Sequence, residues 1–249
     1  MSELRVLAVE GLPEIAADDP LGELIAARAE LSEGDVVVIS QKVVSKAEGR
    51  IRRLAAEIPG AEARKLAAVL GKEPALVELI LEESATVLRA ERGVLIVETR
   101  HGFVCANAGI DSSNLAEEGT VALLPEDPDA SARRIRAEIE AACVGPTMGV
   151  VISDSFGRAW RLGQAEVAIG CAGLAPLDDW RGRADASGRE LEATLIAIAD
   201  EAAAAADLVR DKASRVPAVV VRGIGQHVSA EDGPGAAALR RPPDDDLFR

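Results

Sequence analysis

The stretch that decides the fold reads Val150-Val151-Ile152-Ser153-Asp154-Ser155-Phe156-Gly157-Arg158-Ala159-Trp160-Arg161-Leu162-Gly163-Gln164. Its first three residues are apolar and β-branched, which is typical of a strand in a sheet covered on both faces. The stretch then becomes polar and is interrupted by Gly157 and Gly163. We therefore predict a buried strand that ends in a loop carrying Asp154 and Ser155 on a rigid support. The alternative is a solvated turn in which these two side chains only cap the backbone.

The length of 249 residues is enough to bury roughly 70–75% of the unfolded surface without a disulfide or a metal. Cys105, Cys143 and Cys171 lie far apart and form no CxxC pair, which fits a reducing cytoplasm. The acidic start of the chain is unlike a signal peptide, and no apolar run approaches the ~20 residues of a membrane helix. We expect a soluble cytoplasmic protein with no membrane partner.

The formal net charge of −14 argues against a nucleic-acid partner, because such binding depends on a basic face that neutralises phosphates. A small anionic ligand remains compatible with this charge, since a few arginines or a bound divalent ion can reverse the local field.

Apolar periodicity and turn signals predict an α+β fold with mixed β-sheets covered by helices, and no linker divides residues 1–249 into separate domains. Strands are predicted at 5–9, 35–40, 93–98, 120–124, 150–152 and 217–223. Helices are predicted from Pro20, as the first helical residue, to about 31, at 61–83 with a break near Gly71 and Pro74, at 130–144 after a cap at 127–129, and at 190–213. Residues 229–245 are rich in Gly, Pro and Asp, and we expect either a disordered end or a loop that orders on a ligand or partner.

The common catalytic motifs are absent from the sequence, which has no P-loop, GxGxxG, HExxH or GxSxG pattern. His101 and Cys105 lie four residues apart and suggest a Cys–His nucleophile. A cysteine among small apolar residues more often serves packing, so we favour a structural role for Cys105.

The remaining candidates for a functional site are side chains that carry oxygen. Asp111 and Asn114 follow one glycine-rich loop, and Asp154 and Ser155 follow the buried strand. If the two carboxylates came within about 4 Å of each other, their repulsion would be ~4 kcal/mol at an effective dielectric constant of 20. One of them would then be protonated, or a cation would lie between them. Carboxylate, hydroxyl and water ligands are typical of Mg²⁺ or Mn²⁺.

Such ions usually recruit phosphates, and Lys42, Lys46, Arg158 and Arg161 are candidate phosphate partners. Each of them alone is typical of a surface charge, so this prediction depends on their convergence in the fold.

Several segments together resemble a known family. They are 12–15 (LPEI), 40–50 (SQKVVSKAEGR), 108–114 (AGIDSSN), 153–164 (SDSFGRAWRLGQ), 239–242 (LRRP) and 246–248 (DLF). In this order they resemble the coenzyme F420-0:L-glutamate ligases, the F420 gamma-glutamyl ligases, over essentially the whole chain. The resemblance implies a mixed α/β homodimer. Some family members carry a second, nitroreductase-like flavin domain, which we do not expect in this single module of residues 1–249.

The resemblance also implies an activity, that of an acid–amino-acid ligase. GTP would phosphorylate the terminal carboxylate of F420-0, and the amine of L-glutamate would attack the acyl phosphate. The products would be F420-1, and then γ-linked F420-2, with GDP and phosphate. Two divalent ions per site, Mg²⁺ or Mn²⁺, would act as the clamp, with K⁺ as a further candidate. Two alternatives stay open, a metal-dependent phosphohydrolase and a non-catalytic nucleotide-binding regulator. The number of glutamates and a dehydro or glyceryl form of the acceptor are also open.

The resemblance assigns roles by position. Asp111 and Asp154 match catalytic positions that bind the first ion. Ser155, where the family often has Thr, matches a ligand of the second ion. The positions that match GTP-binding residues are Leu12, Pro13, Glu14, Ile15, Gln41, Lys46 and Asn114. From their chemistry alone, we assign Arg158, Trp160, Arg161 and Gln164 to the phosphodiester or glutamate side of the substrate.

Overall fold

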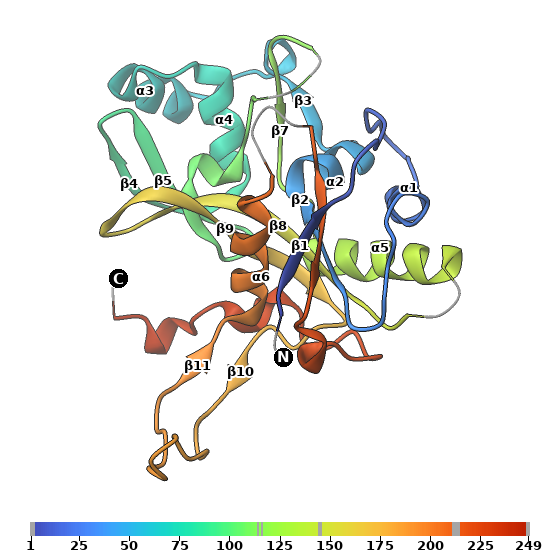
Figure 1. Cartoon of the computed structure of the whole chain (residues 1–249). Helices are drawn as coiled ribbons and strands as arrows, with labels where there is room; N and C mark the ends of the chain where they lie inside the picture. Colours follow the sequence, from blue (N-terminus) through green and yellow to red (C-terminus); the bar gives the residue numbers. More distant parts are fainter. Residues whose placement is uncertain (1–2, 114, 116, 144–145, 211–214, 248–249) are drawn as a thin grey trace.

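The computed structural model describes residues 3–113, 115, 117–143, 146–210 and 215–247. Its centre is a five-stranded sheet in the order β1-β12-β2-β8-β9 (Figure 1). The strands are β1 (Arg5–Ala8), β12 (Ala218–Arg222), β2 (Val36–Ser40), β8 (Gly149–Arg158) and β9 (Arg161–Ala172). β2 and β8 are parallel, and the other neighbours are antiparallel.

Both faces of this sheet are covered, because its central strands are apolar on both sides. Val37 and Ile39 of β2 pack with α1 (Leu21–Ala26) and α5 (Pro128–Ala142) on one face. Val36 and Val38 pack with the alanine-rich α6 (Ile198–Asp207) on the other. The prediction of a buried strand covered on both faces is confirmed for residues 150–152, which are fully buried in β8.

The predicted loop after this strand is wrong. β8 continues to Arg158 and pairs with β9 through to Arg161, so residues 153–164 form a β-hairpin with a turn at Ala159 and Trp160. The strand continues through the polar residues because β8 keeps its backbone hydrogen bonds to β9 beyond the point where β2 ends. The two strands then form an arm that is open to water on both faces.

A second group of elements lies at one end of the main sheet (Figure 1). It contains the β4-β5-β6 sheet and the β3-β7 pair. The strands are β3 (Ile51–Arg53), β4 (Ser84–Glu91), β5 (Val94–Thr99), β6 (Val104–Ala106) and β7 (Thr120–Ala122), and the helices are α3 (Ala61–Leu70) and α4 (Pro74–Glu82). Gly71 ends α3 in the left-handed conformation, with φ 64°, so the predicted break between the two helices is confirmed.

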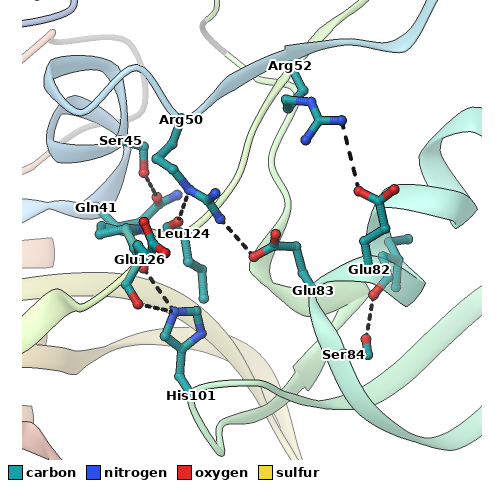
Figure 2. A network of polar contacts seen from close by, with 12 residues as sticks. Gln41, Ser45, Arg50, Arg52, Glu82, Glu83, Ser84, His101, Leu124 and Glu126 are labelled. Carbon is teal, nitrogen blue, oxygen red and sulfur yellow. Dashed lines mark hydrogen bonds and ion pairs between the residues drawn. The ribbon is translucent and has the colours of Figure 1, made fainter. Parts of the chain in front are cut away.

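Arg50, directly before β3, links two parts of this group, the segment after β7 and the end of α4. Its Nε donates to the carbonyl of Leu124 at 3.1 Å, and its Nη2 donates to Glu83 at 2.8 Å, next to the end of α4 (Figure 2).

These mixed sheets with their covering helices confirm the α+β prediction. Short 3-10 turns complete the fold at η1 (Leu54–Ala56), η2 (Asn107–Gly109), η3 (Gly225–His227), η4 (Ala236–Leu239) and η5 (Pro243–Asp245). Within the described ranges, we find no helix that combines the length and the apolar character needed to cross a bilayer.

Two predicted helices are shorter than expected. α1 ends at Ala26, and Pro20 is its N-cap rather than its first residue, because the Asp19 carboxylate accepts from the amide of Ala16 instead of capping the helix. α6 begins only at Ile198, because the residues before it belong to a two-stranded pair, β10 (Asp178–Asp179) and β11 (Leu195–Ile196).

The helix predicted at 130–144 is observed as α5, and Asp127 caps it by accepting from the amide of Ala130. Residue 144 lies outside the described residues. Residues 229–237 of the tail are bonded to this helix, so the expectation of a disordered end is wrong for this part of it. The buried guanidinium of Arg136 pairs with Asp232 at 2.8 Å, and Asp129 accepts from the amide of Ala236 at 2.7 Å.

Candidate functional site

A cavity of about 640 Å³ opens where β2 ends and β8 continues. In parallel sheets the carboxyl ends of strands are the usual place for a ligand. The lining residues come from five separate segments: Leu12, Pro13, Glu14 and Ile15; Ser40, Gln41, Lys42, Val43 and Lys46; Asp111, Ser113 and Leu115; Asp154, Ser155 and Glu166; and Asp207, Arg210, Arg215, Val216 and Pro217.

The helix α2 (Gln41–Ala47) begins directly after β2 and places its polar residues at the cavity. Its helical form puts Lys42 and Lys46 on neighbouring turns of one face. Gln41 is buried, and its side-chain oxygen accepts from the Ser45 hydroxyl at 2.9 Å (Figure 2). Lys46 Nζ lies 2.5 Å from a carboxylate oxygen of Glu14, so the loop after β1 and the helix α2 meet at the cavity wall.

Asp111 reaches the cavity from the loop after η2. It accepts from the amide of Ser113 at 2.7 Å, and its other oxygen lies 2.7 Å from Lys42 Nζ. Burial favours a higher pKa for Asp111. The hydrogen bonds from Lys42 and Ser113 and the lysine charge outweigh burial, and the net pKa is lowered. Asp111 is therefore held as a carboxylate.

The pKa of Asp154 is shifted in the opposite direction to that of Asp111. The pKa of Asp154 is raised to about 7, first by burial and then by the negative charges of Glu166 and Asp111, against the opposing effect of the Ser155 amide and Lys42. Two acids with pKa values pushed apart in one cavity are typical of a functional site.

Asp154 and Ser155 are adjacent in β8, so their side chains leave opposite faces of the strand. Asp154 interacts with Asp111 and Lys42, and Ser155 donates to Glu166 Oε1 at 2.6 Å. Both nevertheless line the same cavity, because β8 has passed the end of β2 at this point.

No sequence motif pointed to Glu166 or Arg210, yet both line the cavity. Glu166 lies opposite Ser155 in the β8–β9 register and is buried, and Arg210 Nη1 lies 3.2 Å from its second oxygen. Burial lowers the pKa of Arg210 against the raising effect of Glu166 and Asp207. Recognising the hairpin would have placed Glu166 beside Ser155; nothing local in the sequence places Arg210 there.

Of the predicted site residues, the structure brings together Leu12, Pro13, Glu14, Ile15, Gln41, Lys46, Asp111, Asp154 and Ser155. Asn114 lies outside the described residues. Arg158, Trp160, Arg161 and Gln164 belong to the far part of the hairpin and do not line the cavity. Arg158 instead donates to the carbonyl of Leu162 at 2.8 Å and closes its own turn.

The Cys–His pair is not a nucleophile and base. Burial and the charge of Asp154 together raise the pKa of Cys105 to about 12, so the thiolate is disfavoured. The Nε2 atom of His101 contacts the carbonyl oxygens of Pro125 and Glu126 instead of the thiol (Figure 2).

The donor set fits a hard divalent cation. Carboxylates and a hydroxyl line the cavity, and the raised pKa of Asp154 indicates a place where added positive charge would be favourable. Across the described part of the chain, no group of three His, Cys, Asp or Glu side chains forms a ready-made cluster. A cation here would therefore draw part of its shell from Ser155, water or the oxygens of a bound ligand.

Comparison with known proteins decides the family. The family model of F420-0:gamma-glutamyl ligase matches residues 11–223. The chain belongs to this family of ligases. It is 44% identical to the coenzyme F420:L-glutamate ligase of Methanothermobacter thermautotrophicus over 99% of both chains. It is also 46% identical to the protein of the same name from Archaeoglobus fulgidus, over 89% of this chain and 88% of that one. The F420-0:gamma-glutamyl ligase resemblance drawn from the motifs, and the assignment as a ligase, are confirmed.

Proposed function

We propose that this chain is a GTP-dependent ligase that joins L-glutamate to coenzyme F420-0. An acyl phosphate is the intermediate, GDP and phosphate are released, and a second, γ-linked glutamate follows the first. The relatives named above are coenzyme F420:L-glutamate ligases. The observation that carries the proposal is that the acidic pair Asp111 and Asp154 shares one cavity with Lys42 and Lys46.

In this proposal the nucleotide lies along the first two segments of the cavity wall. Leu12, Pro13, Glu14 and Ile15 enclose one side, and Gln41 is held in place by Ser45. Lys46, and Lys42 beside it, meet the phosphates. Phosphoryl transfer requires alignment and charge neutralisation rather than covalent help from the protein, and this cavity offers fixed cations on a helix.

The same proposal includes divalent ions, Mg²⁺ or Mn²⁺. Asp111 and Asp154 would hold the first ion, and Ser155, on the other face of β8, would hold the second. When bound, the ions neutralise negative charge on the transferred phosphoryl group. The requirement for K⁺ stays a prediction, and so does the role of Asn114.

We also propose a homodimer. The hairpin end exposes 82% of Trp160 and 97% of Leu162, and exposed apolar side chains on an arm favour a protein partner. The substrate roles of Arg158, Trp160, Arg161 and Gln164 depend on this assembly, because in one chain these residues do not line the cavity. Sedimentation of the purified protein tests it, and a monomer at the assay concentration would refute it.

The activity is tested by incubating the protein with GTP, Mn²⁺ and glutamate, with and without F420-0. GDP is measured by chromatography and F420-1 by mass spectrometry. The ligase predicts equal amounts of GDP and F420-1, and no GDP without F420-0. GDP release that is indifferent to F420-0 would indicate the phosphohydrolase, and nucleotide binding without turnover would indicate the regulator.

The variants Asp111→Asn and Asp154→Asn sharpen this test, since each removes one charge from the acidic pair. Both should lower kcat by about 100-fold or more, the usual cost of a lost electrostatic contact to the transition state. Asp179→Asn is the matched control, because Asp179 is an exposed carboxylate in β10, away from the cavity.

A further inference from the structure

A second cavity, of about 250 Å³, lies where the turn between β5 and β6 meets the start of α5 and the C-terminal tail. It shares no lining residue with the cavity described above. Cavities for drug-sized ligands usually measure roughly 300–1,000 Å³, so this one suits a smaller molecule. Arg240 lines it, so segment 239–242, which carries part of the family resemblance but has no role in the proposed function, reaches a cavity.

The wall of the second cavity is held by hydrogen bonds within the chain. The Phe103 amide donates to Thr99 Oγ1 at 3.1 Å, which closes the turn between β5 and β6. His101 Nε2 lies 2.9 Å from the carbonyl oxygen of Pro125 and 3.1 Å from that of Glu126 (Figure 2). The His101 ring stacks on Phe103, with the ring centroids 5.8 Å apart. The turn and the residues before α5 are therefore fixed relative to each other.

Two exposed arginines line this cavity, Arg100 and Arg240, and neither has a carboxylate partner in the described part of the chain. The Arg240 guanidinium lies over the Phe103 ring, 6.0 Å from its centroid. Gly102 leaves room for it, because an added Cβ would lie 2.9 Å from Arg240 Nη1. A guanidinium can donate two parallel hydrogen bonds to one carboxylate, so these two side chains favour a ligand that carries carboxylates.

The acids that line the second cavity are Glu126, Asp127 and Asp129, and the backbone already uses two of them. Asp127 accepts from the amide of Ala130 at 2.9 Å, and Asp129 accepts from the amide of Cys171 at 2.9 Å. Both aspartates lie at the N-terminal end of α5, whose dipole offsets their charge. Glu126 is exposed, and its carboxylate has no partner among the described residues.

The second cavity lies beside the first. The rings of Phe103 and Phe156 pack edge to face, with their centroids 6.2 Å apart. Phe156 follows Asp154 by two residues in β8, so the two side chains leave the same face of the strand. Cys105, two residues after Phe103, is within reach of the charge of Asp154. One pair of phenyl rings therefore connects the wall of the second cavity to the acidic pair.

The second cavity offers two cations and one anion that are not paired with each other in the described part of the chain. An acidic amino acid carries the complementary charges, two carboxylates and one ammonium group. We propose that the second cavity binds an acidic amino acid, with Arg100 and Arg240 at its carboxylates and Glu126 at its ammonium group. In the proposed function this ligand is the L-glutamate that is joined to F420-0, so its identification as the co-substrate rests on that proposal.

The experiment is equilibrium dialysis of labelled L-glutamate against the full chain, with GDP and Mn²⁺ but without F420-0, so that no reaction occurs. Arg100→Ala and Arg240→Ala should each weaken glutamate binding about tenfold or more, because each removes a charge-assisted contact. In the complete assay the KM for glutamate should rise by a similar factor, and the KM for GTP should change by less than about threefold. Both arginines are exposed, so the two variants should fold.

Glu126→Gln tests the ammonium contact. The unsubstituted protein should bind L-glutamate about tenfold or more tightly than glutarate, which has both carboxylates but no amine. In Glu126→Gln this preference should fall below about threefold, with glutarate binding nearly unchanged. A residue that serves only the structure would weaken both ligands alike, and that result would refute the role of Glu126.

Arg133→Ala is the matched control, because Arg133 is exposed on α5 and lines neither cavity. It should leave glutamate binding and both KM values unchanged. Equal glutamate binding in Arg100→Ala, Arg240→Ala and this control would overturn the inference, and so would absence of glutamate binding by the unsubstituted protein. Glutamate binding that depends on the two arginines, without any formation of F420-1, would instead contradict the proposed function and support the second cavity as an amino-acid site.

Discussion

Asp111 and Asp154 line the same cavity, yet their pKa values are shifted in opposite directions. Lys42 and Ser113 stabilise the carboxylate of Asp111, whereas Asp154 is partly buried near Glu166 and Asp111 without a comparable counter-charge. The cavity therefore holds one firm anion and one acid that takes up a proton near neutral pH.

In the metal-free protein, Asp154 should make stability fall as pH rises. Its folded pKa is about 7 and its unfolded value is 3.8, so between these values the folded state keeps a proton that the unfolded state has lost. Asp154→Asn removes this effect. Relative to the unsubstituted protein, the variant should gain on the order of 2–4 kcal/mol in the free energy of unfolding between pH 4 and pH 8, at about 1.4 kcal/mol per pKa unit. Urea denaturation in EDTA measures it, and a difference independent of pH would contradict the assignment.

Lys46→Ala should raise the KM for GTP about 10–100-fold, with a much smaller effect on the KM for glutamate. The reason is the loss of a charge-assisted contact to phosphate, which is worth about 1.5–3 kcal/mol. Steady-state kinetics measures both constants. Lys65→Ala is the control, because Lys65 is exposed on α3. Equal GTP dependence in the two variants would refute a phosphate role for Lys46.

Gly170→Ala should destabilise the fold by about 1–3 kcal/mol, the usual cost of overpacking a core. An added Cβ would lie 2.3 Å from the carbonyl oxygen of Pro128, at the contact between β9 and the start of α5. Gly157, in the same hairpin, has no atom within 4 Å of an added Cβ. Gly157→Ala should therefore stay within about 0.5 kcal/mol. Chemical denaturation of both variants tests the pair, and similar losses would show that the contact is not tight.

Asp35→Ala should cost about 1–3 kcal/mol, because it removes the fully buried acceptor of Arg222 and of the Ser32 amide. Asp179→Ala breaks an ion pair with Arg181 that is about half exposed on both sides, and it should have a much smaller effect on stability. Thermal and urea unfolding compare the two. Equal losses would mean that burial does not distinguish these pairs.

Local chemistry was enough for much of the fold. The apolar runs at 36–39 and 150–152 predicted buried strands, Gly71 and Pro74 predicted the break between α3 and α4, and Asp127 predicted the start of α5. Each of these depends on neighbours in the chain. Residues 153–164 were different, because a polar run gives no local sign that it pairs with another strand.

The sequence by itself determined the class of fold, the family and most of the residue types that line the cavity. Only the tertiary structure decided which of them meet. Asp111 meets Lys42, 69 positions earlier, because the loop after η2 reaches α2. Arg210 reaches Glu166 because the residues after α6 return to the sheet. The same folding leaves Arg158 and Trp160 outside the cavity. Motif spacing cannot show these contacts, because they depend on how strands and helices pack, and burial together with neighbouring charges then sets the pKa of Asp154.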